Sequence, residues 1–397
     1  MNNDFADEVI RQKKIVEEGA RKAALKAKKE IIEMLIEAEI EEILPQRYAK
    51  KREGKQTTLI CPNCGVRKAN QIRRDGHYKR KLIVSEGIIE DLRVPRIECK
   101  DCGHYLKLTF KILDPKKRYW KDVEEEVLSL YLRGVSYRKI KMIVGRKMAS
   151  RMGITTGWQR IQRIGRKLRE KEEKNYKKAD ILALDEVALR VKGERRWGLL
   201  VRTMEEPSQI QMFISPFKDK ESWESALSRF PQPRAVVSDG DRAIESAVKE
   251  IWPGVRMQRC IWHILRGISL EMKGKIPSEK LRELSQRVRE ALSSGDLSLA
   301  FQKVKDLVWD YGEAGYQIGL EIGKGLEYIR ARRSGLEIPQ TTSLLERDIK
   351  EFRRRVRPMD GFFSEEGARN FSAIWVKMRN LQRQGVDWLE GIMKEAV

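Results

Sequence analysis

The chain has 397 residues, of which 41% are hydrophobic and 36% charged, so it is long enough for two or three domains with buried cores. Its formal net charge of +23 favours a polyanionic partner, usually nucleic acid, although a ribosome-associated or merely basic protein stays open. No run of 18 apolar residues occurs and the N-terminus lacks the apolar core of a signal peptide, so we expect neither a membrane span nor secretion.

Residues 1–45 are predicted to form an N-terminal helical segment that ends at Pro45. Apolar residues recur at helical spacing between lysines and glutamates, at Ile31, Ile32, Leu35, Ile36 and Ile40. A basic linker, RYAKKREGKQ, follows. The amphipathic pattern makes this helix a candidate interface between copies of the chain.

Residues 46–117 are predicted to form a zinc-ribbon-like DNA-binding domain. Two CxxC pairs, each followed by glycine and 34 residues apart, supply the thiols of Cys61, Cys64, Cys99 and Cys102. Such pairs can bring four thiolates onto one structural Zn²⁺ ion, although the usual separation is about 15–20 residues. Two pairs argue against a thioredoxin-like dithiol. Cysteine usage of this kind suits a reducing compartment, so we expect a cytoplasmic protein.

The segment between the cysteine pairs is predicted to be a basic hairpin of short strands. Residues 45–120 contain 20 Lys or Arg against 8 Asp or Glu, a net charge of +12 and half of the chain's surplus. Clustered positive charge is typical of a surface that contacts phosphates. The expected DNA contacts are Arg73, Arg74, His77, Lys79, Arg80 and Lys81. A solvated hairpin without a DNA role is the alternative.

Residues 118–177 are predicted to form a helical, helix-turn-helix-like DNA-binding region. Gly134 permits a sharp turn, and Ser136 can cap the helix that follows it. A later helix, capped by Thr155 or Thr156, is expected to expose side chains that read purine edges in the major groove: Gln159, Arg160, Gln162 and Arg163. A role in packing alone is the alternative.

The pattern of apolar residues changes from Ala179 onward. It predicts three strands in series, followed by alternating helices and strands. This order predicts a mixed sheet in an α/β layout. Residues 263–335 are almost entirely helical in pattern. The whole chain is therefore expected to be a multidomain α+β / α/β protein.

Two carboxylates stand out in the predicted sheet. Asp185 lies inside an apolar strand, where a carboxylate is costly unless a cation pairs with it. Asp239 ends the strand AVVSDG, where the glycine turn lets it face a site at the sheet's carboxyl edge. Phosphoryl transfer between nucleic-acid strands uses two divalent ions roughly 3.5–4 Å apart, held by such carboxylates. Alternation along the strand predicts that only one of Asp185 and Glu186 faces the site.

Several segments resemble the Mutator-type transposases. VVSDGDRAIESAVKEIWPGVRMQRCIWHILRGI resembles the family's central signature, and PQTTSLLERDIKEFRRRVRPMDGF resembles its final signature. EAEIEEILPQRYAKKR, RRDGHYKRKLIVSEGIIEDLRVPR and LSLYLRGVSYRKI resemble the family's N-terminal half. The resemblance covers most of residues 35–375.

The resemblance implies an RNase H-like catalytic core with an all-helical insertion. The core would comprise residues 178–262 and 336–375, the insertion residues 263–335, and a C-terminal helix residues 376–397.

The acidic triad implied by the resemblance is Asp185, Asp239 and Glu346, holding two Mg²⁺ (or Mn²⁺) ions. The nearest rivals are Glu186 for the first acid, Asp241 for the second, and Glu351 or Glu365 for the third. This chain departs from the commoner pattern by adding the two CxxC pairs. It also has Ser-Leu-Leu before Glu346, where the commoner form has Asn and Ala.

Cys260 and His263 match the family's Cys-x-x-His element. A buried structural pair, a hydrogen bond near the active site and a DNA contact all stay open for them. Trp262 is expected in the core, with base stacking as the alternative. Basic residues on the helix that carries Glu346 are expected to contact phosphates, with a solvated face as the alternative: Arg347, Arg353, Arg354 and Arg355.

The implied function is that of a DNA transposase, which binds the terminal inverted repeats of a mobile element and target DNA and then cuts and joins strands. Synapsis of two ends implies a homodimer or higher oligomer, associated with the nucleoid in a prokaryote. A domesticated, non-catalytic DNA-binding protein and an RNase H-like nuclease are the alternatives.

Overall fold

The computed structural model describes residues 2–44, 59–65, 71–108, 110–113, 117–148, 153–171, 176 and 178–396. Pro45 and the basic linker after it lie outside these ranges. The chain divides into two compact units, an N-terminal unit of residues 1–131 and 135–160 and a C-terminal unit of residues 132–134 and 161–397. The mixture of helices and two sheets agrees with the expected fold class. No described helix combines the length and apolarity needed to cross a membrane.

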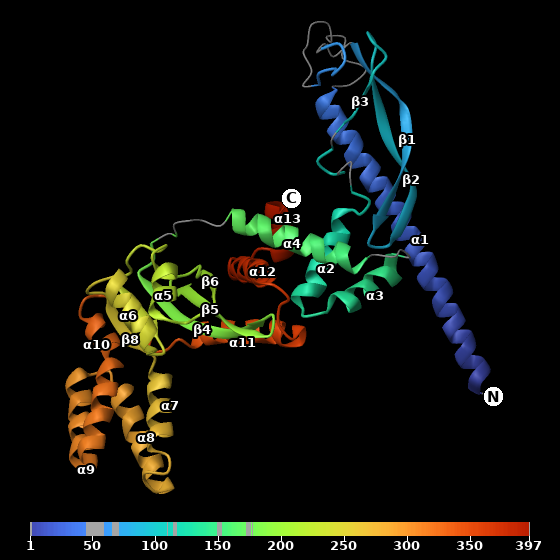
Figure 1. Cartoon of the computed structure of the whole chain (residues 1–397). Coiled ribbons are helices and arrows are strands. Elements are labelled where there is room, and N and C mark those ends of the chain that lie inside the picture. Colours follow the sequence, from blue (N-terminus) through green and yellow to red (C-terminus); the bar gives the residue numbers. More distant parts are fainter. Residues whose placement is uncertain are drawn as a thin grey trace. The chain divides into compact units, whose positions relative to one another are not determined.

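The N-terminal unit is built on a helix and a long hairpin. Helix α1 (Asn2–Ile43) runs beside strands β1 (Ile72–Val84) and β2 (Gly87–Cys99), and β3 (Tyr105–Leu106) pairs with the end of β2 (Figure 1). The residues expected to be helical lie in α1, whereas the strands are 13 residues long each rather than short. Two register shifts interrupt the ladder, and between them the strands pair continuously past the basic residues.

The spacing of apolar residues explains how α1 packs on the hairpin. Ile32, Ile36 and Ile40 are fully buried, whereas Ile31 and Leu35 are exposed. Residues four apart lie on one helical face, so this stripe meets apolar side chains of both strands. The resulting core includes Leu82, Val84, Ile89, Leu92 and Val94.

Three helices follow the hairpin: α2 (Lys121–Leu132), α3 (Tyr137–Met148) and α4 (Ile154–Glu170). Gly134 has a φ of +81°, which favours glycine at the predicted turn. The Ser136 hydroxyl accepts a hydrogen bond from the N–H of Lys139, as expected for a cap. Helix α4 begins at Ile154, so Thr155 and Thr156 lie inside its first turn and the cap predicted there is wrong.

A mixed five-stranded sheet forms the centre of the C-terminal unit, as predicted. Its order is β6-β5-β4-β7-β8, with three antiparallel strands followed by two parallel ones. The strands are β4 (Ile181–Val191), β5 (Glu194–Thr203), β6 (Ile210–Ser215), β7 (Ala235–Ser238) and β8 (Arg256–Arg259). Helices α5 (Lys220–Leu227) and α6 (Arg242–Ile251) bury Trp223, Ile244 and Val248 against one face.

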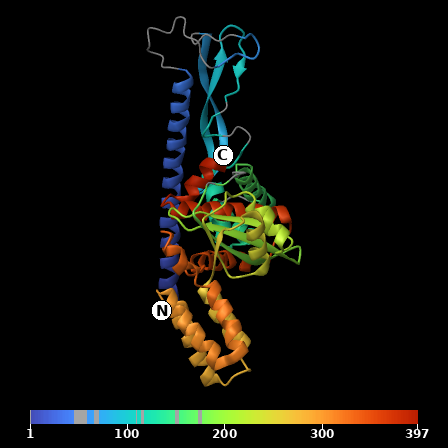
Figure 2. The same cartoon turned by 90° about the vertical axis from the view of Figure 1, so that its left-hand side faces the viewer.

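The predicted helical stretch after β8 consists of α7 (Ile261–Met272), α8 (Ser278–Leu292), α9 (Leu297–Lys324) and α10 (Glu327–Arg332). Figures 1 and 2 both show α7, α8 and α9 gathered into a bundle that extends from the sheet.

Helix α9 reverses direction at Gly312, which has a φ of 58° and a ψ of −130°. A Cβ atom on Gly315 would lie 2.2 Å from the carbonyl oxygen of Leu307, and one on Gly319 would lie 2.8 Å from the Val304 side chain. Residues eight apart in a straight helix are about 12 Å apart, so the two arms of α9 pack antiparallel. Glycine allows this close approach because it has no side chain.

Helices α11 (Ser343–Val356), α12 (Glu365–Arg383) and α13 (Trp388–Ala396) complete the unit. The single C-terminal helix predicted at residues 376–397 is thus two helices, the first of which begins earlier. Helix α12 packs beside β6, the edge strand of the sheet. There the Asn380 carboxamide donates to the carbonyl of Ile210 at 3.0 Å and accepts from its N–H at 2.8 Å.

Candidate active site

Asp185 and Asp239 meet at one edge of the sheet. Strands β4 and β7 are parallel, and Leu184 pairs with Ser238, the last residue of β7. Asp185 and Asp239 are the next residues on their strands, so both carboxylates emerge at the same edge. Together with Glu186 they offer ligand oxygens that all lie within 4.8 Å of one another.

The prediction that only one of Asp185 and Glu186 faces the site is wrong. Alternation does hold, because Glu186 follows Leu182 and Leu184 on the face covered by α5 and α6, and Asp185 lies on the other face. However, the pairing of β7 with β4 ends at Leu184. At Asp185 and Glu186, the edge of β4 that faces β7 therefore has no paired strand. Both carboxylates therefore reach round the open edge to one point.

The environment of Asp185 disfavours its charged form. Burial, followed by the nearby carboxylate of Asp239, raises the pKa of Asp185 to about 7. The Oδ1 atom of Asp185 accepts a hydrogen bond from the N–H of Glu186 at 2.7 Å. In the same way, Oδ1 of Asp239 accepts from the N–H of Asp241 at 2.9 Å. The backbone thus orients both carboxylates while their charges repel each other.

Glu346 belongs to a neighbouring cluster with Cys260 and His263. Its Oε1 atom lies 3.7 Å from Nδ1 of His263 and accepts a hydrogen bond from the Thr342 hydroxyl at 3.2 Å. The interaction with the Cys260 thiol, followed by the carboxylates of Asp239 and Glu346, raises the pKa of His263 to about 9. The imidazolium of His263 therefore links the third acid to the first two, electrostatically rather than through one shared group of ligand atoms.

Helix α11, which carries Glu346, is fixed by a buried charge cluster. Asp348 is only 1% exposed and lies 2.6 Å from Arg202 of β5 and 2.7 Å from Arg379 of α12, and it also contacts Arg383. Arg202 donates a further hydrogen bond to the carbonyl of Leu344. These contacts set the position of α11 along the sheet, and with it the position of Glu346.

The four expected zinc-binding thiols converge. The Sγ atoms of Cys61 and Cys102 are 3.5 Å apart, as are those of Cys64 and Cys99, and all four lie within 4.8 Å of one another. A tetrahedral ion with Zn–S bonds of 2.3 Å separates its sulfurs by about 3.8 Å, so the four residues fit Zn²⁺. A hydrogen bond from Asn63 contributes most to lowering the pKa of Cys102 to about 7, which favours a thiolate.

Most of the basic side chains proposed on the hairpin have acidic partners. Arg73 lies 2.7 Å from Glu98, Lys81 lies 2.8 Å from Glu90, and Arg74 and His77 both approach Glu37. Arg80 donates to the carbonyl of Lys117, and Lys79 is exposed. The excess of positive charge on the hairpin is therefore partly neutralised within the N-terminal unit.

The exposed face predicted for α4 is only partly found. Gln159 and Arg163 are exposed. Arg160 forms an ion pair with Glu124 and lies over the ring of Tyr119, while Gln162 is buried and accepts a hydrogen bond from Asn370 at 2.7 Å.

The arginines of α11 also divide into two sets. Arg347 and Arg353 are exposed, and Arg354 is exposed while lying 3.4 Å from Glu351. Arg355 instead lies 2.8 Å from Glu351 and donates to the carbonyl of Leu132, so it is mainly structural. Trp262, expected in the core, is 66% exposed.

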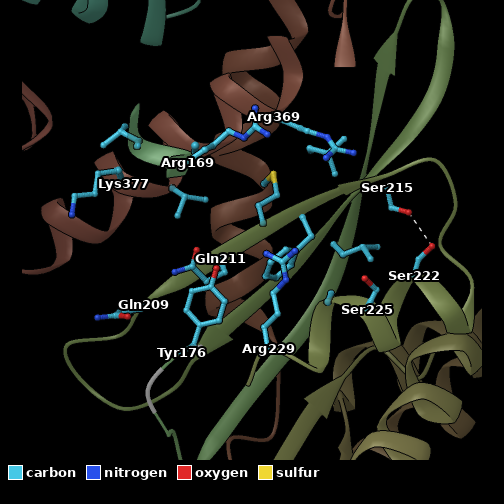
Figure 3. Close-up of a pocket in the computed structure, with 18 of the residues that line it drawn as sticks. Arg169, Tyr176, Gln209, Gln211, Ser215, Ser222, Ser225, Arg229, Arg369 and Lys377 are labelled. Carbon is cyan, nitrogen blue, oxygen red and sulfur yellow. Dashed lines mark hydrogen bonds between the residues drawn. The ribbon is translucent and has the colours of Figure 1, made fainter. Parts of the chain in front are cut away.

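A groove of about 1120 Å³ runs along β6 between α5 and α12. Figure 3 shows Arg169, Arg369 and Lys377 around it, with Arg229 on the α5 side. The three proposed catalytic acids do not line this groove. One end of it, at Phe217 and Asp219, flanks Lys218, whose Nζ atom contacts the carboxylates of Glu186 and Asp241.

Sequence reasoning missed Lys218 and Asp348. Lys218 lies in the loop PFKDK, where no periodic pattern distinguishes it from a solvated lysine. Asp348 does carry a signal, because it occupies a position in line with Leu345, Ile349 and Phe352 on the apolar face of α11. A carboxylate on such a face must have a partner.

A strongly basic chain whose sheet gathers carboxylates at one edge has the features of a protein that acts on nucleic acid. Two family models match it: "Transposase, Mutator family" over residues 6–194 and "MULE transposase domain" over residues 198–267. The chain is 24% identical over 359 residues to the transposase for insertion sequence element IS256 in transposon Tn4001 of Staphylococcus aureus and of Enterococcus faecalis, covering 83% of this chain and 88% of each relative. The chain belongs to the Mutator family of transposases.

Proposed function

We propose that this transposase is a DDE enzyme that binds the ends of a mobile DNA element and catalyses metal-dependent strand cleavage and strand transfer. The convergence of Asp185 and Asp239 from separate strands at the sheet edge carries the proposal. The strand order, with three antiparallel strands followed by two parallel ones, supports an RNase H-like core interrupted by the helical insertion of residues 263–335.

Asp185 and Asp239 would hold Mg²⁺ (or Mn²⁺), because carboxylate oxygens are the ligands that these ions prefer. Glu346, in the neighbouring cluster, would complete the ligands of a second ion. Bound divalent ions activate the attacking oxygen and stabilise the leaving oxygen in phosphoryl transfer. The chain's own contribution is to hold the carboxylates at the sheet edge. The hydrogen bond with Cys260 and the nearby carboxylates raise the pKa of His263, so its imidazolium would add a positive charge beside Glu346.

Several surfaces would bind double-stranded DNA outside the catalytic centre. The Zn²⁺-bound ribbon and the hairpin would present Lys79, and α4 would present Gln159 and Arg163. Beside the acids, Arg347 and Arg353 would contact phosphates.

Joining two element ends would require at least a dimer. Helix α1 exposes Val9, Ile10, Ile15 and Val16 in its first half, ahead of the stripe that packs on the hairpin. Exposed apolar residues on a long helix are suited to pairing with a second copy. We propose this part of α1 as a contact in the assembled enzyme.

The test is a strand-transfer assay with labelled element-end DNA, plasmid target and Mg²⁺. Asp239→Asn should reduce cleavage and joining by at least 100-fold, because it removes a metal ligand's charge. Asp306→Asn on the exposed surface of α9 is the matched control and should retain activity. Unchanged activity of the Asp239 variant would rule out the assigned role. Cleavage without joining by the unmodified protein would indicate a nuclease instead.

A further inference from the structure

Glu186 has a buried carboxylate oxygen that nothing in the described part of the chain satisfies. Its side chain is only 9% exposed. Its Oε1 atom accepts a hydrogen bond from Nζ of Lys218 at 2.7 Å, but its Oε2 atom is buried without a hydrogen-bond partner. A buried, unpaired carboxylate oxygen is costly, so its retention requires a partner.

The surroundings of this oxygen point to a cation. Asp185, Glu186 and Asp239 each have one oxygen held by the protein: by the N–H of Glu186, by Nζ of Lys218 and by the N–H of Asp241. Among the described residues, no hydrogen bond is donated to the second oxygen of any of the three. Their ligand atoms converge to within 4.8 Å, which is the arrangement that a hard divalent ion requires.

Lys218 alone does not neutralise this cluster. Its single charge is shared between Glu186 and Asp241, the latter at 2.8 Å. Both carboxylate oxygens of Asp241 have partners among the described residues, unlike those of the three clustered acids. The oxygen that does not contact Lys218 caps helix α6 by accepting from the N–H of Ala243 at 2.8 Å. Lys218 and the nearby His263 are thus shared among more carboxylates than they can neutralise. Glu186, which keeps one oxygen without a hydrogen bond from the described residues, belongs to the same group of ligand residues as Asp185 and Asp239.

We propose that Glu186 is a further ligand of the divalent ion held by Asp185 and Asp239, and that Lys218 is the positioning residue that holds it there. This inference rests on the proposed two-metal function. It adds a fourth carboxylate to the expected triad and assigns Lys218 a role in holding Oε1 so that Oε2 points at the ion. The alternative is that Glu186 is only the ion-pair partner of Lys218.

Metal binding separates these two roles without measuring catalysis. Mn²⁺ is titrated into the full-length protein, and free Mn²⁺ is followed by electron paramagnetic resonance. Glu186→Gln should weaken the tighter site by about 10- to 100-fold, the range seen when groups that hold a metal are altered. Glu186→Asp keeps the charge but shortens the side chain, and it should weaken binding as well because its oxygen falls short of the ion.

Asp241→Asn is the matched control. It removes the same charge beside the same lysine, but from a residue outside the cluster, and asparagine is an equally good helix cap. Its Mn²⁺ affinity should stay within about three-fold of the unmodified protein, because Asp241 is not among the residues whose ligand atoms converge and its second oxygen caps α6. Equal weakening by Asp241→Asn and Glu186→Gln would show a general charge effect and would overturn the inference, as would unchanged affinity in both Glu186 variants.

Asp185→Asn separates failure of this inference from failure of the proposed function. If Asp185→Asn abolishes Mn²⁺ binding while both Glu186 variants bind normally, only the role of Glu186 is lost. If none of the three variants changes Mn²⁺ binding, the metal centre itself is wrong. Thermal unfolding without added Mn²⁺ or chelator identifies folded variants, and Glu186→Asp gives the answer if the Gln variant fails to fold.

Discussion

Burial and the neighbouring Asp239 disfavour the ionised form of the Asp185 carboxyl group. Its pKa of about 7 in the fold compares with an ordinary value of 3.8. Between these two values the folded protein binds a proton that the unfolded chain does not, so the free energy of unfolding falls as pH rises from about 4 to 7. Above pH 7, folding in the absence of a cation must accommodate the ionised carboxylate.

Asp185→Asn should therefore stabilise the cation-free protein at pH 8. Asparagine removes the buried charge, and we expect a gain of about 1–3 kcal/mol in the free energy of unfolding, an amount discounted for partial exposure. The gain should shrink toward pH 5, where Asp185 is already protonated. The transition of the C-terminal unit in thermal unfolding without added divalent ions measures it at both pH values, with Asp306→Asn as the control. A loss of stability at pH 8 would contradict the assigned pKa shift.

The sequence predicted that Asp185 and Asp239 belong to the site, but not which other side chains lie beside them. An acidic residue inside an apolar strand and another at a strand–glycine junction are visible in the pattern, and parallel pairing brings them together. Glu186 lies close to the two aspartates because the pairing of β7 with β4 ends just before it. The residue pattern of a single strand does not reveal where such a pairing ends. Lys218 acts through contacts between distant segments, so spacing along the chain does not single it out. The spacing of Asp348 places it on the apolar face of α11 but does not identify its arginine partners.

At the scale of elements, the position of α11 depends on one buried carboxylate. Asp348 faces three arginines from β5 and α12, and its removal leaves their charges uncompensated. Asp348→Ala should lower the free energy of unfolding by about 3–5 kcal/mol. Lys350→Ala, on the exposed side of the same helix, should change it by less than about 0.5 kcal/mol. Urea unfolding of both variants tests this, and similar effects would argue against the cluster as the anchor of α11.

The reversal in α9 gives a second test at this scale. Gly315→Ala places a Cβ atom against the Leu307 carbonyl, and we expect a loss of about 1–3 kcal/mol in the free energy of unfolding. Gly323→Ala in the same arm meets nothing within 4 Å and should be stabilising by about 0.5–1 kcal/mol because alanine favours helix. Thermal unfolding distinguishes them. If Gly315→Ala is also stabilising, the two arms do not pack as described.

Elements were more predictable than their lengths and exposures. The buried stripe of α1, the mixed sheet and the helical insertion follow from periodicity of apolar residues, which reports the face that packs. The exposure of Trp262 and the burial of Gln162 depend on what each face meets. The long hairpin was underestimated because the cysteine pairs suggested turns, whereas the segment between them pairs along nearly its full length.

At the scale of the whole molecule, the two compact units should respond separately to loss of zinc. The four thiols lie in the N-terminal unit, and a small metal-bound core loses much of its folding free energy without the ion. Cys61→Ser should therefore lower the unfolding temperature of one calorimetric transition and leave that of the C-terminal unit nearly unchanged. Bound zinc is measured in parallel by atomic absorption. If protein purified without zinc shows both transitions at the same unfolding temperatures as the zinc-containing protein, the ion is not structural.

The side chain of Asn380 has a consequence for how this basic protein behaves at high concentration. Strand β6 is a sheet edge, and an unpaired edge invites another polypeptide to extend the ladder. The Asn380 carboxamide forms hydrogen bonds with both the N–H and the carbonyl of Ile210, as a neighbouring strand would. It therefore occupies the hydrogen-bonding groups of this residue at the sheet edge. An approaching chain finds this position occupied, so polymerisation through this edge is discouraged.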